Sequence, residues 1–345
     1  MSKLVLTAVG PATSVQDGGR YGAQRYGLTP SGAVDRLALA AGNCLVGNPP
    51  FAAAIEIGPF STSFAVREGT VRVALTGAVR DAEVSGRSVP FNESCTLVGG
   101  DSLTLGAARD GMFSYLAIEG GVKGEPMFGS LAVNARAGLG SPFPRPFQAG
   151  DVLDVDTARA GIEHGIELPI QADGPIRIVM GPQDDEFGEA TELFLGSEWK
   201  ISAASDRMGY RLEGPTIKHL HGHNIVSDGT VNGSIQIPGS GQPIVLMPDR
   251  GTTGGYPKIA TVITSDLGSF AQIPVGRSFR FKAVTIAEAQ TVARSMADLL
   301  RTLPDRVFEI RNANINDALQ NANIGGTAVN AFDSGTWQTW PPLEQ

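Results

Sequence analysis

Apolar and polar residues alternate in short segments along most of the chain, and glycine or proline separates one segment from the next. A period of two residues is typical of strands that bury one face. Lys3–Val9 shows this pattern and is predicted to be the first strand. Between Ile55 and Val155 the pattern recurs in the segments IEI, STSFAV, VRVALTG, CTLV, SLTLG, FSYLAI and VLDV. With 44 Gly and 22 Pro in 345 residues, the composition favours many short strands joined by turns over long helices.

Helical signals are confined to a few places. Asp35 has the position of an N-cap for a helix over 36–45, and residues 184–195 have a helix-like pattern. Thr285 and Glu288 have the spacing of a capping box. The apolar positions that follow form a stripe: Ile286, Ala289, Val292, Ala293, Met296, Leu299 and Leu300. We expect this last helix to pack on a β domain.

Several landmarks of the first half recur in the same order in the second half. The strand and Gly-Pro pair at 176–182 repeat those at 5–11. Four further pairs match: Ile57-Gly58-Pro59 with Glu213-Gly214-Pro215, Pro90 with Pro238, Ser114–Ile118 with Lys258–Val262, and Gln148–Val155 with Pro274–Phe281. Matches in a constant order predict a duplicated β domain. We therefore predict a first domain over 1–165, a second over 166–285, and a C-terminal helix with an Asn-rich tail over 286–345.

Charge and cysteine content limit the partners and the cellular compartment to be expected for this chain. The formal charge of −8 argues against nucleic acid or an anionic membrane surface as the main partner. No run approaches the ~18 apolar residues that a membrane helix needs, and the N-terminal apolar segment is short for a signal peptide. Cys44 and Cys95 are the two cysteines, and both have apolar neighbours. Reduced thiols and a cytoplasmic location are therefore expected.

The richest concentration of chemistry lies at Asp249–Lys258, between strands predicted at Ile244–Met247 and Ile259–Ile263. This loop holds an acid, two cations, two hydroxyls and a phenol, and its glycines let the backbone approach a ligand closely. We predict a functional site here and expect Lys258 to be an exposed, well-positioned cation. A hairpin loop whose polar residues face water is the alternative.

Two further groups combine carboxylates with guanidiniums. The first contains Gln16, Asp17, Arg20, Arg25, Ser31 and Asp35, and the second contains Asp206, Arg207 and Arg211. An arginine presents a planar fork that matches carboxylate or amide oxygens, so each group suits a planar polar substrate. Ion pairs that only order a loop or a strand are the alternative in both cases.

Spacing disfavours other chemistries. The glycine loop lacks the GxxxxGK[ST] pattern of phosphate-binding loops, and Pro257 removes a backbone donor. No GxSxG elbow occurs, and neither cysteine has a neighbouring histidine or lysine. His219, His221 and His223 alternate, but no acidic or thiol fourth ligand is evident beside them. We expect no metal site.

Several segments together resemble one known family. In order over residues 3–285 they are VQDGGRYGAQRYGLTPSGAVDR, NCLVGNP, IEIGPFSTSF, ALTGA, SDRMGYRLEGP and GQPIVLMPDRGTTGGYPKIATVITSDL. They resemble the biotin-dependent carboxyltransferase-like family, also called allophanate hydrolase subunit 2. It includes KipA proteins, the C subunit of bacterial 5-oxoprolinase, and half of the carboxyltransferase region of urea carboxylase. The chain departs from the family's pattern in two places. One is the long Asn-rich tail past Pro304. The other is Ser130–Gly140, where the family's pattern leads us to expect a charged or hydroxyl pair.

The resemblance implies a mainly β chain with two tandem cyclophilin-like β barrels, and its obligate partner would be a KipI-like B subunit. It also implies one component of an ATP-dependent amide or lactam hydrolase, with 5-oxo-L-proline as favoured substrate. The further partner would be a LamB/YcsF-like A subunit. ATP would serve the whole complex. One alternative is carboxyl transfer from carboxybiotin to urea, the only case that needs biotin. Another is a KipA-like regulatory protein that, with its partner, blocks a sensor kinase.

Residue chemistry at the positions that the resemblance indicates assigns the roles. Catalysis is assigned to Asp17, Arg20, Arg207, Asp249 and Lys258. Substrate binding is assigned to Gln16, Ser31, Asp35, Asp206, Arg211, Gln242, Thr252, Thr253, Gly254 and Tyr256.

Overall fold

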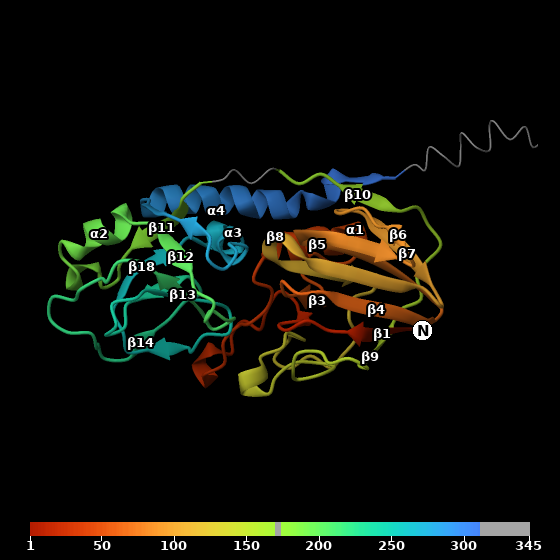
Figure 1. Cartoon of the computed structure of the whole chain (residues 1–345), viewed down its shortest axis with the longest axis horizontal. Coiled ribbons are helices and arrows are strands. Elements are labelled where there is room, and N and C mark those ends of the chain that lie inside the picture. Colours follow the sequence, from red (N-terminus) through yellow and green to blue (C-terminus); the bar gives the residue numbers. More distant parts are fainter. Residues whose placement is uncertain (170–173, 311–345) are drawn as a thin grey trace, which may run out of the picture. The chain divides into compact units, whose positions relative to one another are not determined.

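Two tandem β sheets form the framework of the protein (Figure 1). The computed structural model describes residues 1–169 and 174–310. Contacts group Met1–Phe308 into one compact unit. The expected mainly β fold with few helices is confirmed. The domain boundaries at 165/166 and 285/286 stay predictions, and the Asn-rich tail from residue 311 lies outside the described residues.

Nine strands make up the first sheet: β1 (Ser2–Ala8), β2 (Ser14–Gln16), β3 (Ala54–Ile57), β4 (Thr62–Glu68), β5 (Thr70–Val84), β6 (Arg87–Ser88), β7 (Ser94–Val98), β8 (Ser102–Ile118) and β9 (Val152–Val155). The path runs β2-β3-β8-β4-β1-β9, and β5 pairs with β6, β7 and β8. The predicted strands SLTLG and FSYLAI prove to be the two ends of β8. Long-range pairing with β5 joins them, and the register shifts between Gly77 and Ala82 absorb the irregular middle.

Gly77 shows why this pairing needs glycine. Its φ of +91° is a left-handed conformation, and an added Cβ would lie 2.6 Å from the carbonyl oxygen of Phe113. Only a residue without a side chain accommodates both the conformation and the close neighbouring strand.

The second sheet contains β11 (Ile176–Met180), β12 (Trp199–Ile201), β13 (Gly209–Glu213), β15 (Ser234–Gln236), β16 (Ile244–Leu246), β18 (Lys258–Val262), β19 (Ser278–Phe279) and β20 (Phe281–Ala283). Its order is β19-β12-β13-β16-β15-β18-β11-β20. Its strands are shorter than those of the first sheet, and they leave more of the chain in loops. The predicted match between 148–155 and 274–281 does not extend to pairing direction, because β9 runs antiparallel to β1 whereas β20 runs parallel to β11.

The remaining short strands are β10 (His164–Ile166), β14 (Asp228–Gly229), β17 (Thr253–Gly254) and β21 (Val307–Glu309). The α-helices are α1 (Arg36–Leu45), α2 (Ala190–Gly196), α3 (Leu267–Ala271) and α4 (Ile286–Arg301). The 3-10 helices are η1 (Gln24–Tyr26), η2 (Ala135–Ala137), η3 (Asp184–Glu186), η4 (Thr264–Asp266) and η5 (Leu303–Arg306).

Local capping signals place both long helices correctly. The Asp35 carboxylate accepts a hydrogen bond from the Ala38 N–H at the start of α1, as predicted. Thr285 and Glu288 form the predicted capping box of α4. The helix pattern predicted at 184–195 resolves into η3 and α2, with residues 187–189 between them.

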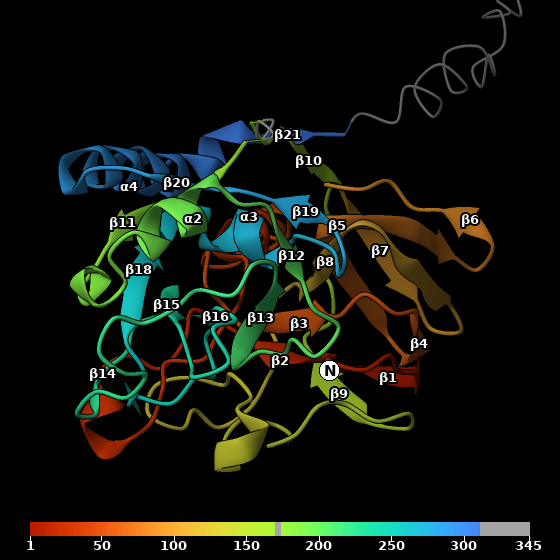
Figure 2. The ribbon, with the colours of Figure 1, turned by 60° about the vertical axis from the view of Figure 1, so that its left-hand side comes forward.

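Two hydrophobic cores fill the structure. One lies within the first sheet around Leu4, Phe64 and Leu116. The other is shared, because it packs α1 and the β8 side chain of Phe113 against second-sheet residues such as Trp199. Helix α1 contacts β8, and both are labelled in Figure 1; Figures 1 and 2 show α4 beside β11. The shared core fixes the two sheets to each other within Met1–Phe308.

Both cysteines are free, as expected. No helix among the described residues is long and apolar enough to cross a membrane.

Candidate active site

A buried ion-pair network joins the two sheets. Arg207, in the turn before β13, donates from Nη1 to Glu56 on β3 and from Nε to Asp249 Oδ2 at 2.9 Å. Its Nη2 donates to the Gly32 carbonyl at 2.7 Å. Each of its nitrogen atoms therefore has an acceptor, and Arg207 ties the second sheet to the first.

The other Glu56 oxygen is held equally firmly. Oε2 accepts from the Tyr115 hydroxyl at 2.7 Å and from the Val34 N–H at 3.0 Å. Burial raises the pKa of Glu56, and the positive charge of Arg207 opposes that rise. Burial likewise raises the pKa of Tyr115 well above its usual value. We call Glu56, Tyr115, Arg207 and Asp249 the junction cluster; sequence reasoning missed its first two members.

The Asp17 carboxylate is hydrogen-bonded to the loop that contains Ser130 and Leu131. Its Oδ1 accepts from the Gly19 N–H and from the Ser130 hydroxyl, both at 2.7 Å. Its Oδ2 accepts from the Leu131 N–H at 2.7 Å. Ser130 lies in the segment where a charged or hydroxyl pair was expected; the position of that pair stays a prediction.

Arg20 is the least satisfied of the predicted cations. Its side chain is 0% exposed, and Nη2 donates to the Ala132 carbonyl. Its Nε and Nη1 have no hydrogen-bond partner among residues 1–169 and 174–310. Burial lowers the pKa of Arg20, while the nearby charges of Asp17 and Asp249 raise it. The guanidinium thus keeps donors free for a ligand.

Glycines make the Arg20 loop possible. Gly32 has a φ of +86°, and a Cβ there would lie 2.8 Å from the backbone of Gly19. The backbone around Gly19 therefore packs directly against the backbone around Gly32. The Arg20 N–H donates to the Pro30 carbonyl at 2.7 Å in the same place. This contact fixes the start of the Arg20 side chain.

Lys258 occupies a different environment from the one expected. The prediction of an exposed lysine is wrong, because the residue is only 2% exposed. Its Nζ donates to Asp228 Oδ2 at 2.7 Å, and its backbone N–H donates to Gln183 Oε1 at 3.0 Å. That ion pair lowers the pKa of Asp228. Lys258 is the first residue of β18, so its backbone is well positioned, as predicted. Its side chain points into the protein and not into solvent.

Several predicted substrate-binding residues have structural contacts. Gln16 is buried and donates to Ser14 Oγ at 3.0 Å, whereas its Oε1 has no partner within the described part of the chain. Ser31 Oγ accepts from Asn134 Nδ2 at 3.1 Å. Asp35 caps α1 and also accepts from Gln272 Nε2 at 3.0 Å.

The remaining predicted residues lie on the second sheet and its loops. Asp206 Oδ1 accepts from the backbone N–H of Met208 at 2.8 Å and closes the turn before β13. Arg211 is exposed, and Gln242 donates to the Gly214 carbonyl at 3.2 Å. These contacts leave Arg211 and Gln242 apart from the junction cluster. The last four residues form or adjoin β17: Thr252, Thr253, Gly254 and Tyr256.

The structure thus brings Asp17, Arg20, Arg207 and Asp249 into one electrostatic cluster at the contact between the sheets. Lys258 belongs to a different group, in which it pairs with Asp228 on β14, the strand that pairs with β17. The catalytic and binding roles of these residues stay predictions.

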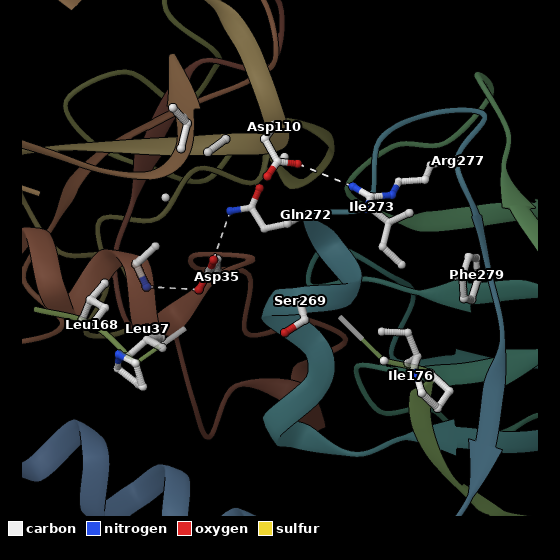
Figure 3. A pocket seen from close by; sticks show the side chains of 18 of the residues that line it. Asp35, Leu37, Asp110, Leu168, Ile176, Ser269, Gln272, Ile273, Arg277 and Phe279 are labelled. Atoms are coloured by element: carbon white, nitrogen blue, oxygen red, sulfur yellow. Dashed lines mark hydrogen bonds and ion pairs between the residues drawn. The ribbon is translucent and has the colours of Figure 1, made fainter. Parts of the chain in front are cut away.

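A pocket of about 790 Å³ opens elsewhere between the two sheets (Figure 3). Asp35 is the single predicted site residue in its lining, and its carboxylate is engaged by Ala38 and Gln272. An Asp110–Arg277 ion pair of 3.5 Å joins the sheets at this pocket. We place the candidate site at Arg20 rather than here, because Arg20 has free buried donors.

Metal ligands are not clustered in the described part of the chain: no group of three or more His, Cys, Asp or Glu side chains could hold an ion. His219 Nε2 contacts the Ile237 carbonyl at 2.9 Å, and His221 Nδ1 lies 3.4 Å from Glu186.

Comparison with known proteins shows the family of the chain. Residues 26–283 match the model of the family described as carboxyltransferase domain, subdomain A and B. The chain belongs to this family. It is 36% identical over 315 residues to the 5-oxoprolinase C subunit of Escherichia coli, and the match covers 90% of this chain and 100% of that protein. It is 37% identical to the 5-oxoprolinase C subunit of Haemophilus influenzae, over 81% of this chain and 91% of that protein.

Solved structures give the same family picture. The urea carboxylase of Kluyveromyces lactis superposes with a TM-score of 0.79 at 26% identity. That match covers 90% of this chain but 31% of the urea carboxylase chain, so this protein corresponds to one part of the larger enzyme.

Proposed function

We propose that this chain is the C subunit of an ATP-dependent 5-oxoprolinase, which opens the lactam ring of 5-oxo-L-proline. One observation carries the proposal: the similarity to the C subunit of E. coli 5-oxoprolinase extends over 90% of this chain and the whole of that protein. Two unpaired cysteines suit a reducing, cytoplasmic setting.

Arg20 suits the chemistry of this reaction. Transfer of a phosphoryl group from ATP to the amide oxygen releases ADP and makes the ring carbon electrophilic. The phosphoryl group then carries negative charge on its oxygens beside that carbon, and the electron pair of the C=N bond moves to the ring nitrogen when water attacks. Donors that are already aimed and shielded from water stabilise such charge strongly. The free Nε and Nη1 atoms of Arg20 are buried donors of this kind. Asp17, beside it, holds the opposing loop through Ser130 and Leu131.

Partner subunits complete the site in this proposal. The Asp17 carboxylate is occupied by backbone and hydroxyl donors, and the Asp249 carboxylate is occupied by Arg207. This engagement leaves neither acid poised as a base toward an attacking water. The partners that we expect to supply the base and the ATP site are the KipI-like B subunit together with the LamB/YcsF-like A subunit.

Reconstitution tests the proposal. The chain is co-expressed with its B and A subunits, and phosphate release from ATP is measured with 5-oxo-L-proline, urea and 2-pyrrolidinone. We expect 5-oxo-L-proline to stimulate ATP hydrolysis in the complete complex and not in the lone chain. Robust stimulation of the lone chain would contradict the partner requirement. A complete complex that ignores 5-oxo-L-proline would contradict the substrate assignment.

Carboxyl transfer to urea is the second candidate, favoured by the fold similarity to urea carboxylase. It requires a biotin carboxylase and a biotinylated carrier. In the same assay it predicts urea-dependent ATP hydrolysis that appears only with these components and that avidin abolishes.

A further inference from the structure

Two buried donors near β14 and β17 have no acceptor. Arg250 is 4% exposed and Gln236 is 6% exposed. Neither Arg250 Nε nor Gln236 Nε2 has a hydrogen-bond partner in the described ranges 1–169 and 174–310. Leaving a buried donor unpaired costs about 1–3 kcal/mol, and more when the group is charged. A buried donor that the protein itself leaves unpaired is available to a ligand.

Thr230 links the two side chains. Arg250 Nη2 donates to the Thr230 carbonyl at 3.3 Å. A Cβ built on Gly254 would lie 2.3 Å from Gln236 Nε2 and 3.4 Å from Thr230 Cγ2. Gln236 and Thr230 therefore lie against the same glycine of β17, and Arg250 contacts the carbonyl of Thr230. Residue 254 must be a glycine for Gln236 to keep this position.

The neighbouring carboxylates are already engaged. Asp249 accepts from Arg207 at 2.9 Å, and Asp228 accepts from Lys258 at 2.7 Å. Burial lowers the pKa of Arg250, and the negative charge of Asp249 opposes this. Among the described residues, Arg250 is thus a buried cation without a carboxylate of its own, and an uncompensated buried charge is costly.

We propose that Arg250 and Gln236 form a subsite for the carboxylate of a small cyclic amide acid. This assignment rests on the proposed function and deepens it: Arg20 faces the amide oxygen, and Arg250 with Gln236 binds the acid group. An arginine edge and an amide N–H together offer a carboxylate two or more charge-assisted hydrogen bonds. A lactam without the acid group cannot make them.

A short ribbon borders the subsite, because Gly254 of β17 lies against Gln236. β14 and β17 pair through Asp228 with Gly254 and through Gly229 with Thr253, so each strand contributes two residues. Both ribbon views show β14 beside the orange-red turn of residues 24–26 (Figures 1 and 2). Parting such a ribbon breaks few hydrogen bonds, and the ligand reaches Arg250 and Gln236 when it parts.

The first test separates binding from turnover. KM and kcat of the reconstituted complex are measured for 5-oxo-L-proline with wild type, Arg250→Gln, and Arg294→Gln, an exposed arginine on α4 as matched control. We expect Arg250→Gln to raise KM tenfold to a hundredfold with kcat within about threefold, and the control to match wild type. Unchanged KM in a folded Arg250→Gln complex would overturn the proposal.

A second variant, Gln236→Glu, should make the protein more stable and at the same time weaken its binding of substrate. Gln236→Glu keeps the shape of the side chain and places a carboxylate beside Arg250. We expect the melting temperature to rise and KM for 5-oxo-L-proline to increase at least tenfold, because the new carboxylate occupies the subsite. A lower melting temperature, or tight binding of the substrate, would contradict the assignment. This variant also serves if Arg250→Gln does not fold.

Calorimetric titration distinguishes failure of the subsite from failure of the proposed function. The wild-type and Arg250→Gln complexes are titrated with 5-oxo-L-proline and with its uncharged amide, 5-oxo-L-prolinamide. We expect wild type to bind the acid at least tenfold more tightly than the amide, and Arg250→Gln to bind both equally weakly. This preference supports the subsite even if turnover is absent. If Arg250→Gln weakens binding of the acid and of the amide by the same factor, the proposal is overturned. It is also overturned if wild type does not bind the acid.

Discussion

Arg207 and Arg20 are both shielded from water, but they differ in what their guanidinium groups contact. Arg207 has an acceptor at every nitrogen: Glu56, Asp249 and the Gly32 carbonyl. Within residues 1–169 and 174–310, the Arg20 guanidinium donates to a single carbonyl, and two of its nitrogens have no partner. A saturated buried arginine holds the structure together, because removing it strands the acids that it pairs. A buried arginine with free donors is available to a ligand. Arg250 shares this second condition.

The largest effect is expected at Arg207. Arg207→Met leaves Glu56 and Asp249 buried without their cation, so we expect unfolding to become easier by about 3–5 kcal/mol. Urea denaturation of the purified chain measures this loss. The double variant Glu56→Gln/Arg207→Gln should recover part of it, because one stranded charge is removed. A loss below about 1 kcal/mol in Arg207→Met would break the contrast with Arg20.

At Arg20 we expect the reverse pattern. Arg20→Gln removes donors aimed at the reacting oxygen, so kcat/KM of the complex should fall about 100- to 1000-fold. The free energy of unfolding should change by only about 1 kcal/mol, since one hydrogen bond to Ala132 is lost. Steady-state kinetics and urea denaturation on one preparation test both values. Preserved kcat/KM with a large loss of stability would make Arg20 a structural residue.

Lys258→Met should have a smaller effect on turnover, roughly tenfold to a hundredfold, because Asp228 already neutralises part of the lysine charge. The fold should survive, since the side chain of Asp228 is 53% exposed and can return to water. Turnover of the complex is compared with a thermal melt of the variant. A collapsed melt together with lost turnover would assign Lys258 a structural role only.

The smallest effect concerns pH. The hydrogen bond from Lys258 lowers the pKa of Asp228 in the folded protein. A lowered carboxyl pKa adds stability above the unfolded value, about 4, and this stability is lost as pH falls through the folded pKa. Melting temperatures of wild type and Asp228→Asn should therefore differ slightly at pH 7, and the difference should shrink as pH falls below about 4. A difference that is constant with pH would exclude this linkage.

Local signals in the sequence predict part of this architecture well. Asp35 and the Thr285–Glu288 capping box mark helix starts, because a cap acts within one turn of the chain. The length of β8 was not predictable in this way, since its central residues are held by pairing with β5, which comes from elsewhere in the chain.

The candidate site shows the same limit. Arg20 and Asp249 stand out by residue type in glycine-rich loops, whereas Glu56 and Tyr115 resemble ordinary strand residues. One signal was available: Glu56 lies between Ile55 and Ile57, and an acid in an apolar strand needs a buried partner. That its partner is Arg207, 151 positions away, depends on how the sheets pack. Likewise, the inward turn of Lys258 could not be inferred from its loop.

Arginine Nε–H resonances provide the most direct test of the distinction between paired and free guanidiniums. The chain is labelled with ¹⁵N-arginine and assembled with unlabelled partners, and Arg→Lys variants assign the signals. Addition of 5-oxo-L-proline should shift the Arg20 and Arg250 signals and leave that of Arg207 unchanged. A shifted Arg207 signal with Arg20 and Arg250 unmoved would contradict the account.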